Sequence, residues 1–277
     1  MESSTVDALP QEAWAAAAAA HEERIDRYVA PHLARRAAGL QHPVFDFLFT
    51  YYSFRPAQLR RWTPGFGVDP DVTPEHVASQ RPLVEALHRL LSATARRAGS
   101  FGCFGLHEWA MVYRLSGDET RHAAWPLRLG PAGTDAVVEG HRIACSHFDA
   151  YRFFTTPARP LNTLSPGRDD RSSYEQPACL HAGMDLYKHA FRLWPMVSSD
   201  LVADCFELAW DIRVVDMRAA PYDLADLGLD PIRIETPDGK QEYVAAQRAF
   251  AERGAPLRAR LVEECARLLE VATSLTT

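Results

Sequence analysis

The stretch LHAGMDLYKHAFRLWPMVSSDLVADCFELAWDIRVVDMR, residues 180–218, decides the fold class. Its first half repeats apolar residues at the spacing of one helix face, namely Leu180, Met184, Tyr187, Phe191 and Trp194. Pro195 ends this helix, because proline has no amide hydrogen to continue the hydrogen-bonding pattern. A second helix is expected from Ser198 or Ser199, with its apolar face at Leu201, Cys205, Leu208, Ile212 and Val215. The stretch therefore predicts two consecutive helices that bury one face each.

Further helices are expected on both sides of this pair. Residues 10–38 are rich in helix-favouring residues and stop at Gly39, and Thr73-Pro74 is typical of a helix start, here of a helix extending to about Arg97. Thr236-Pro237 opens another helical region, and Pro256 is expected to start a separate terminal helix.

Residues 99–160 are the least regular part, with glycines, prolines and short mixed runs that allow a little β structure. The aromatic run at residues 45–54 is too bulky for the surface and predicts core or pocket wall. The expected fold is mainly α: a bundle-like single domain over residues 1–277, with residues 1–10 as a flexible tail.

Composition excludes several classes of protein. The chain has 277 residues, 47% of them hydrophobic and 24% charged, which is ordinary for a globular protein. Its net charge of -6 disfavours nucleic acid as a partner, because such binding relies on clustered basic residues. The five cysteines are scattered without a C-x-x-C pair, which predicts reduced thiols. No signal peptide and no spanning apolar run is visible, so a cytoplasmic protein with no membrane partner is expected.

Three segments place a histidine beside or near a carboxylate: His107-Glu108, His147-x-Asp149 and His181-x-x-x-Asp185. On a helix, the spacing of His181 and Asp185 points both side chains the same way. His147 and Asp149 would share a face if their segment is extended, but they would diverge if it is helical. Imidazole and carboxylate suit non-haem iron or zinc, so His107, His147, His181 and Asp185 are the candidate ligands of a metal cofactor. All six residues are candidate catalytic groups, and Asp185 is the carboxylate expected first.

Other polar residues are candidates for substrate binding. Arg114 and Arg152 have planar guanidinium groups that clamp a carboxylate or phosphate, although structural salt bridges explain them equally well. Lys188 is a candidate cationic contact, one turn beyond Asp185. A polar stripe at Asp204, Glu207 and Asp211 is interpreted first as a solvated helix face. If this face instead lines a cavity, Glu207 and Asp211 are candidate acid–base groups or metal ligands, with Asp216, Arg218 and Tyr222 as supporting residues. The sequence contains no G-x-S-x-G, P-loop or G-x-G-x-x-G motif.

Several segments resemble the bacterial family commonly labelled 3-methyladenine DNA glycosylase. They are HPVFDFLFTYYSFRPAQLRRW, FGLHEWAMVYR, HFDAYRFFT, EQPACLHAGMDLYKHAFRL and SSDLVADCFELAWDIRVVDMRAAPYDL. The resemblance covers roughly His42 to Arg260. This chain departs from the family pattern at Phe45, where a carboxylate usually stands, and at Gly183, where asparagine usually stands.

The resemblance implies a DNA-repair hydrolase that cleaves the N-glycosidic bond of an alkylated purine. It would use a carboxylate of Asp149, Asp185 or Glu108, and an aromatic pocket for the flipped base formed by Tyr51, Tyr52 and Trp109. The alternative is a metal-dependent oxidoreductase or hydrolase that uses the His and carboxylate groups on a small aromatic or carboxylated metabolite. A non-catalytic binding protein is the third hypothesis.

Overall fold

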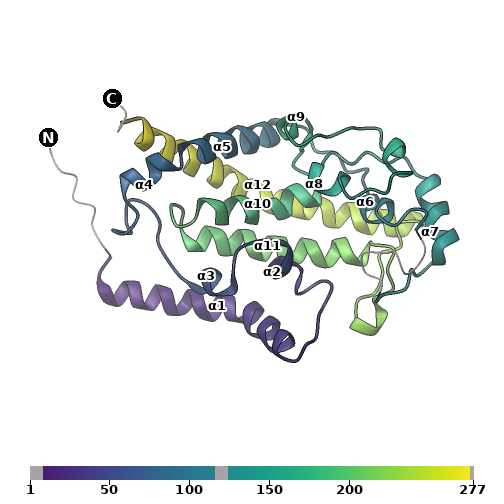
Figure 1. The fold of residues 1–277 in the computed structure, drawn as a ribbon, viewed down its shortest axis with the longest axis horizontal. Helices are drawn as coiled ribbons and strands as arrows, with labels where there is room; N and C mark the ends of the chain where they lie inside the picture. Colours follow the sequence, from purple (N-terminus) through teal and green to yellow (C-terminus); the bar gives the residue numbers. More distant parts are fainter. Residues whose placement is uncertain (1–8, 116–123, 275–277) are drawn as a thin grey trace. The chain divides into compact units, whose positions relative to one another are not determined.

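The computed structural model describes residues 9–115 and 124–274 (Figure 1). Within these ranges the regular structure is helical, apart from two isolated β-bridges, Leu127 to Tyr222 and Ile143 to Asn162. The prediction of a mainly α protein is confirmed, and the middle region contains bridges instead of strands. No helix in the described part is long and apolar enough to cross a membrane. Most of the expected flexible tail, residues 1–8, lies outside the described residues.

The contacts of the described residues divide the chain into two compact units. Unit 1 comprises residues 9–92, 185–210 and 256–274, and unit 2 comprises residues 93–115, 124–184 and 211–255. Four helices have residues in both units: α5 (Arg81–Arg96), α10 (Leu180–Leu193), α11 (Ser199–Arg218) and α12 (Pro237–Ser274). The remaining helices of unit 1 are α1 (Gln11–Ala37), α2 (Phe47–Tyr51), α3 (Pro56–Arg60) and α4 (Pro74–Ser79). Those of unit 2 are α6 (Leu106–Ala110), α7 (Gly130–Glu139), α8 (Phe148–Tyr151), α9 (Arg171–Tyr174) and the 3-10 helices Arg159–Leu161 and Ala225–Leu227.

Most predicted helix ends agree with the structure. α1 ends before Gly39, which adopts a φ of 69°, and the Thr73 hydroxyl accepts a hydrogen bond from the His76 amide at the start of α4. The helix expected to extend from there to Arg97 is divided into α4 and α5 at Gln80.

The terminal part of the chain differs from the prediction. Pro256 does not start a new helix but lies inside α12. Proline removes one hydrogen bond from a helix, yet burial of Leu261, Cys265 and Leu268 after it stabilises the same helix through packing.

The stripe on α11 is more than a solvated face. In unit 1, Arg24 of α1 donates hydrogen bonds to Asp204 at 2.9 Å and to Glu207 at 3.0 Å. In unit 2, Asp211 is exposed and pairs with Arg253 at 2.7 Å. All three carboxylates of the stripe therefore have arginine partners, and the first two join α1 to α11.

Asp46 is the polar centre of the connection between α1 and α2. It accepts hydrogen bonds from His32, Arg35 and the His42 amide, and it is 7% exposed. Burial alone would raise the pKa of Asp46, but the Arg35 and His32 hydrogen bonds outweigh burial and lower it. A lowered pKa stabilises the fold above the unfolded-state value of about 3.9, and this contribution is lost as the pH falls through the folded-state value.

Asp46→Asn is therefore expected to lower the free energy of unfolding by about 1.5–3 kcal/mol at pH 7. The difference from wild type should shrink as the pH falls below about 4, because the carboxylate of the unfolded wild-type chain is protonated first, and it should vanish below the lowered folded-state pKa. Urea denaturation at both pH values measures it. The exposed Asp71→Asn serves as control, and an equal loss at both pH values would contradict the role of the Asp46 charge.

Candidate metal centre

His107 is positioned by a tight turn in front of α6. Phe104 and Gly105 have φ angles of 49° and 71°, a left-handed conformation that favours glycine. A Cβ at position 105 would lie 3.3 Å from the Ala219 side chain, so the turn fits closely against the end of α11. It directs the imidazole of His107 onto Asp216 of α11, with 3.0 Å between Nε2 and Oδ1. The histidine is 3% exposed and the aspartate 0%.

Arg213 and Glu108 complete a buried charge network with this pair. Arg213, one turn before Asp216 on α11, lies 3.0 Å from Oδ2 of Asp216 and 3.2 Å from Oε1 of Glu108. Burial alone would lower the pKa of His107 and raise that of Asp216. Their mutual attraction outweighs burial, so the pKa of His107 is raised and that of Asp216 is lowered. Two carboxylates thus balance one guanidinium and one imidazolium when no metal is bound.

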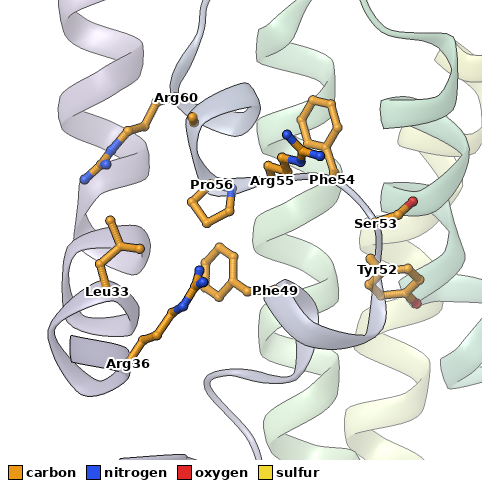
Figure 2. Close-up of a pocket in the computed structure, with 10 residues that line it drawn as sticks. Leu33, Arg36, Phe49, Tyr52, Ser53, Phe54, Arg55, Pro56 and Arg60 are labelled. Carbon is orange, nitrogen blue, oxygen red and sulfur yellow. The ribbon is translucent and has the colours of Figure 1, made fainter. Parts of the chain in front are cut away.

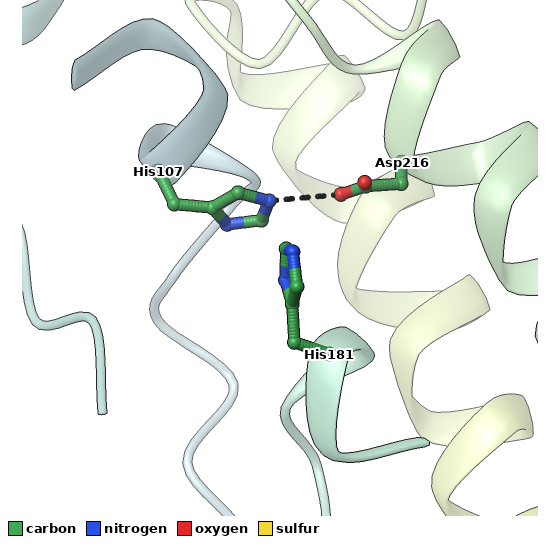
Figure 3. Close-up of side chains that lie close together, drawn as sticks. All are labelled: His107, His181 and Asp216. Atoms are coloured by element: carbon green, nitrogen blue, oxygen red, sulfur yellow. Dashed lines mark hydrogen bonds and ion pairs between the residues drawn. The ribbon is translucent and has the colours of Figure 1, made fainter. Parts of the chain in front are cut away.

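His181 joins this network from the first turn of α10 (Figure 3). Its ring lies 4.5 Å from the ring of His107, centroid to centroid, at an interplanar angle of 84°. One ligand atom each of His107, His181 and Asp216 lie within 4.8 Å of one another. His181 is the partly exposed member of the three. Three separate segments therefore direct two imidazoles and one carboxylate toward the same point.

A third histidine lies next to the cluster. The ring of His147 is 5.3 Å from that of His181, and its Nε2 is 3.5 Å from Oε1 of Glu175. Both His147 and Glu175 are buried, at 0% and 2% exposure. Glu175 is also held by Arg171, one turn earlier in the chain. The His–carboxylate pairing of His107 with Asp216 is thus repeated by His147 and Glu175.

A small cavity opens beside the two ligand histidines. His107 and His181 line it together with the thiols of Cys103, Cys145 and Cys179. It offers about 10 Å³ to the centre of a water-sized ligand, which is roughly the space of one water molecule. Burial raises the pKa of the Cys145 and Cys179 thiols, which keeps them protonated and neutral. The carboxylate and the imidazoles, and not the thiols, are therefore the donors that would bind a hard or borderline cation.

The donor set has the composition and spacing of a metal site. Two histidines and one carboxylate with open positions are typical of non-haem iron(II) centres. Two donor atoms that each lie about 2.1 Å from an ion, at right angles, are roughly 3.0 Å apart. The observed 3.0 Å between His107 Nε2 and Asp216 Oδ1 agrees with this spacing.

The structure brings the three predicted histidine segments together in unit 2, but it replaces the predicted carboxylate. Asp185 lies on α10 as expected and belongs to unit 1, where it accepts a hydrogen bond from the Tyr52 hydroxyl at 3.2 Å and pairs with Lys188 at 3.0 Å. Asp216 is the carboxylate of the cluster. The i,i+4 spacing of His181 and Asp185 predicts only that both side chains lie on the same face of α10. Which carboxylate lies next to His181 depends on the segments packed against it, and here that carboxylate is Asp216.

His147 and Asp149 follow the helical alternative of the sequence analysis. Residues Phe148–Tyr151 form α8, and helical geometry separates alternate side chains. Asp149 pairs instead with Arg152 at 3.4 Å, so Arg152 forms a structural ion pair. Glu108 is also a partner of an arginine, since it contacts Arg213.

The other predicted substrate contacts have structural partners. Trp109 is fully buried, donates its indole hydrogen to the Ala219 carbonyl and lies under the Arg128 guanidinium, so it is a core residue and not a wall for a base. Arg114 lies at the surface with Glu139 at 3.2 Å. Tyr51 stacks on Phe47 at 4.9 Å.

Two residues complete the centre beyond the predicted catalytic and metal-binding set. Arg213 was not predicted, and Asp216 was considered only as a supporting residue. Their signal in the sequence was an arginine and an aspartate one turn apart within the apolar run IRVVDM. Charged residues in such a run are buried together when the helix packs on both faces. Comparison with protein-family models, with curated proteins and with solved structures finds no match, so the site rests on the chemistry of its own residues.

Proposed function

We propose that this protein is a metal-dependent enzyme whose centre is held by His107, His181 and Asp216, with iron(II) as the favoured ion. The observation that carries the proposal is the convergence of their three ligand atoms within 4.8 Å, in a largely buried site. The sequence-based alternative of a His–carboxylate metalloenzyme is supported by this geometry, with Asp216 in the place expected for Asp185.

Two of the three ligands, Asp216 and His107, have a neighbour that contacts the side away from the proposed metal. Arg213 holds Oδ2 of Asp216, which leaves Oδ1 directed toward the histidines. Cys103 lies 3.8 Å from Nδ1 of His107, on the side of the ring opposite Asp216. Such neighbours hold metal-binding side chains in place and tune their basicity. A bound iron(II) with open positions would supply activation of a small ligand such as dioxygen.

His147 lies beside the centre and is the proposed general acid–base residue. Its ring is 5.3 Å from His181, and the Glu175 carboxylate lies behind it at 3.5 Å. A carboxylate that orients an imidazole and stabilises its charged form is a common arrangement for general acid–base catalysis. The cavity of about 10 Å³ beside His107 and His181 accommodates one water-sized ligand. The chemistry that this arrangement supports best is therefore activation of water or dioxygen at the metal, for hydrolysis or oxidation.

The resemblance to proteins labelled 3-methyladenine DNA glycosylase supports a second function, for which Asp185 would be the catalytic carboxylate. Tyr52, which lines a pocket of unit 1, donates a hydrogen bond to Asp185, and this contact favours the hypothesis. The same pocket is lined by Arg36, Arg55 and Arg60, whose charges disfavour a cationic alkylated base. We therefore place the metal-dependent reaction first.

The proposal is tested by anaerobic loading with iron(II), followed by nitric oxide as a probe of an open coordination position. We expect the electron paramagnetic resonance spectrum of the wild-type protein to show the high-spin iron–nitrosyl signal at one spin per chain. His181→Ala should lose at least nine-tenths of this signal, because one of three ligands is gone. His76→Ala, which removes an exposed histidine of unit 1, should retain it.

Absence of the resonance in a folded wild-type protein would contradict the proposal. Release of alkylated bases from DNA by that same protein, abolished in Asp185→Asn, would then establish the glycosylase function. If the protein shows neither the iron–nitrosyl signal nor base release, and the substitutions change only its stability, the hypothesis of a non-catalytic binding protein would be favoured.

A further inference from the structure

A second pocket lies entirely within unit 1 (Figure 2). Its volume is about 520 Å³, within the range of small-molecule sites. The end of α1, the helix α2, the connection after it and α3 form its walls. The side chains of the pocket fall into two chemical groups, an aromatic and apolar set and a set of three arginines.

The aromatic walls are held in place by packing behind them. Phe49 stacks on His32 with 4.4 Å between ring centroids, and Phe54 stacks on Phe191 at 5.1 Å. Tyr52 is fixed by its hydrogen bond to Asp185. A binding site whose walls are already ordered loses less conformational entropy when a ligand enters. These rings therefore form a preformed apolar surface.

The three arginines differ in their partners. Arg60 pairs with Asp26 of α1. Arg36 and Arg55 are exposed and make no ion pair with any described residue. Among the described residues, none that lines the pocket is acidic. In a protein with a net charge of -6, the pocket thus gathers cationic groups whose planar donors match a carboxylate.

We propose that this pocket binds a small aromatic acid, a planar apolar ring system that carries one carboxylate. The ring lies against Phe49, Tyr52 and Phe54, and the carboxylate accepts hydrogen bonds from Arg36 and Arg55. The acidic net charge of the chain disfavours a polyanion such as nucleic acid, whereas one anionic group needs only the local guanidinium groups. No residue lines both this pocket and the metal centre, because every residue in the pocket lining belongs to unit 1.

The test uses 2-naphthoate as the probe and isothermal titration calorimetry as the measurement. We expect one binding site per chain for 2-naphthoate and at least tenfold weaker binding of the neutral 2-naphthamide. Arg36→Ala and Arg55→Ala should each weaken 2-naphthoate at least fivefold. Both arginines are exposed, so the substitutions should leave the thermal transition unchanged. Arg89→Ala, an exposed arginine on α5 in the same unit, is the matched control and should bind as wild type does.

Three results would overturn the proposal. Equal affinity for 2-naphthoate and 2-naphthamide would indicate a purely apolar pocket. Tighter binding of inorganic phosphate or a short oligonucleotide than of 2-naphthoate, measured by displacement of 2-naphthoate, would indicate a phosphate site. No binding of 2-naphthoate at millimolar concentration by the folded protein would exclude the site altogether. None of these results depends on whether the metal centre binds an ion.

Discussion

Asp216→Asn is expected to lower the free energy of unfolding of the metal-free protein by about 3–5 kcal/mol, because it breaks a buried charge network. The carboxylate is 0% exposed and lies 3.0 Å from both His107 and Arg213. Removal of its charge takes an anionic partner away from the Arg213 guanidinium, which is 2% exposed and also contacts Glu108. The side chain of asparagine has nearly the same shape, so the loss reports the charge. Urea denaturation in the presence of a chelator measures it.

Asp211→Asn is a matched control on the same helix. Asp211 pairs with Arg253 at 2.7 Å, but both side chains are about half exposed, at 48% and 49%. Exposed ion pairs contribute about 0–1 kcal/mol, so this substitution should change stability little. Equal effects of the two substitutions would contradict the account of a buried network around Asp216.

The network also predicts the pH dependence of stability in the metal-free protein. The lowered pKa of Asp216 contributes stability above its unfolded-state value of about 3.9, and the contribution is lost as the pH falls through the folded-state value. The raised pKa of His107 contributes stability below about 6.5, and this contribution is lost as the pH rises through the folded-state value. Stability should therefore be greatest between these limits, and Asp216→Asn should flatten both sides of the profile.

His181→Ala is expected to abolish the stabilisation that a bound metal gives, while leaving the metal-free fold intact. An ion that binds only the folded state stabilises it by about 2.7 kcal/mol at a free concentration of 100 times the Kd. His181 is partly exposed, in contrast to His107 and Asp216, and after its loss Asp216 is still paired with His107 and Arg213. Thermal unfolding with and without added zinc, or iron(II) under argon, measures the effect.

The metal-induced rise in Tm should be present in the wild type and in His76→Ala. His181→Ala should show no rise at the same metal concentration, and at least tenfold more metal should be needed to raise its Tm. The exposed His76 is the suitable control because it removes an imidazole without touching unit 2. A rise in Tm that persists unchanged in His181→Ala would place the metal at another site.

The local features of this fold could be predicted from the sequence because they depend on neighbouring residues. The apolar spacing from Leu180 to Trp194 and the proline after it predicted α10, and Ser199 begins α11 within the predicted range. Thr73 and Gly39 mark helix ends through their own hydrogen-bonding and backbone properties. Pro256 followed its local preference less well, since packing on the buried face of α12 outweighs the hydrogen bond that it removes.

The candidate site could be predicted only in part. The histidines were recognisable as chemistry-bearing residues, and the structure brings His107, His147 and His181 together. Their carboxylate partners could not be inferred from spacing, because Asp216 and Glu175 reach the site through tertiary packing. The sequence also did not distinguish the aromatic residues that line a pocket from those in the core. Trp109 belongs to the core, whereas Tyr52 lines a pocket.

The central claim is that His107, His181 and Asp216 form one metal site, and cobalt(II) titration of metal-free protein tests it most directly. We predict visible absorption bands that saturate at one cobalt per chain, with an intensity that His181→Ala removes and His76→Ala leaves unchanged. Competition by iron(II) or zinc should bleach the same bands. Absence of saturable cobalt binding, or bands of equal intensity in His181→Ala, would contradict the claim and leave the cluster as a buried charge network.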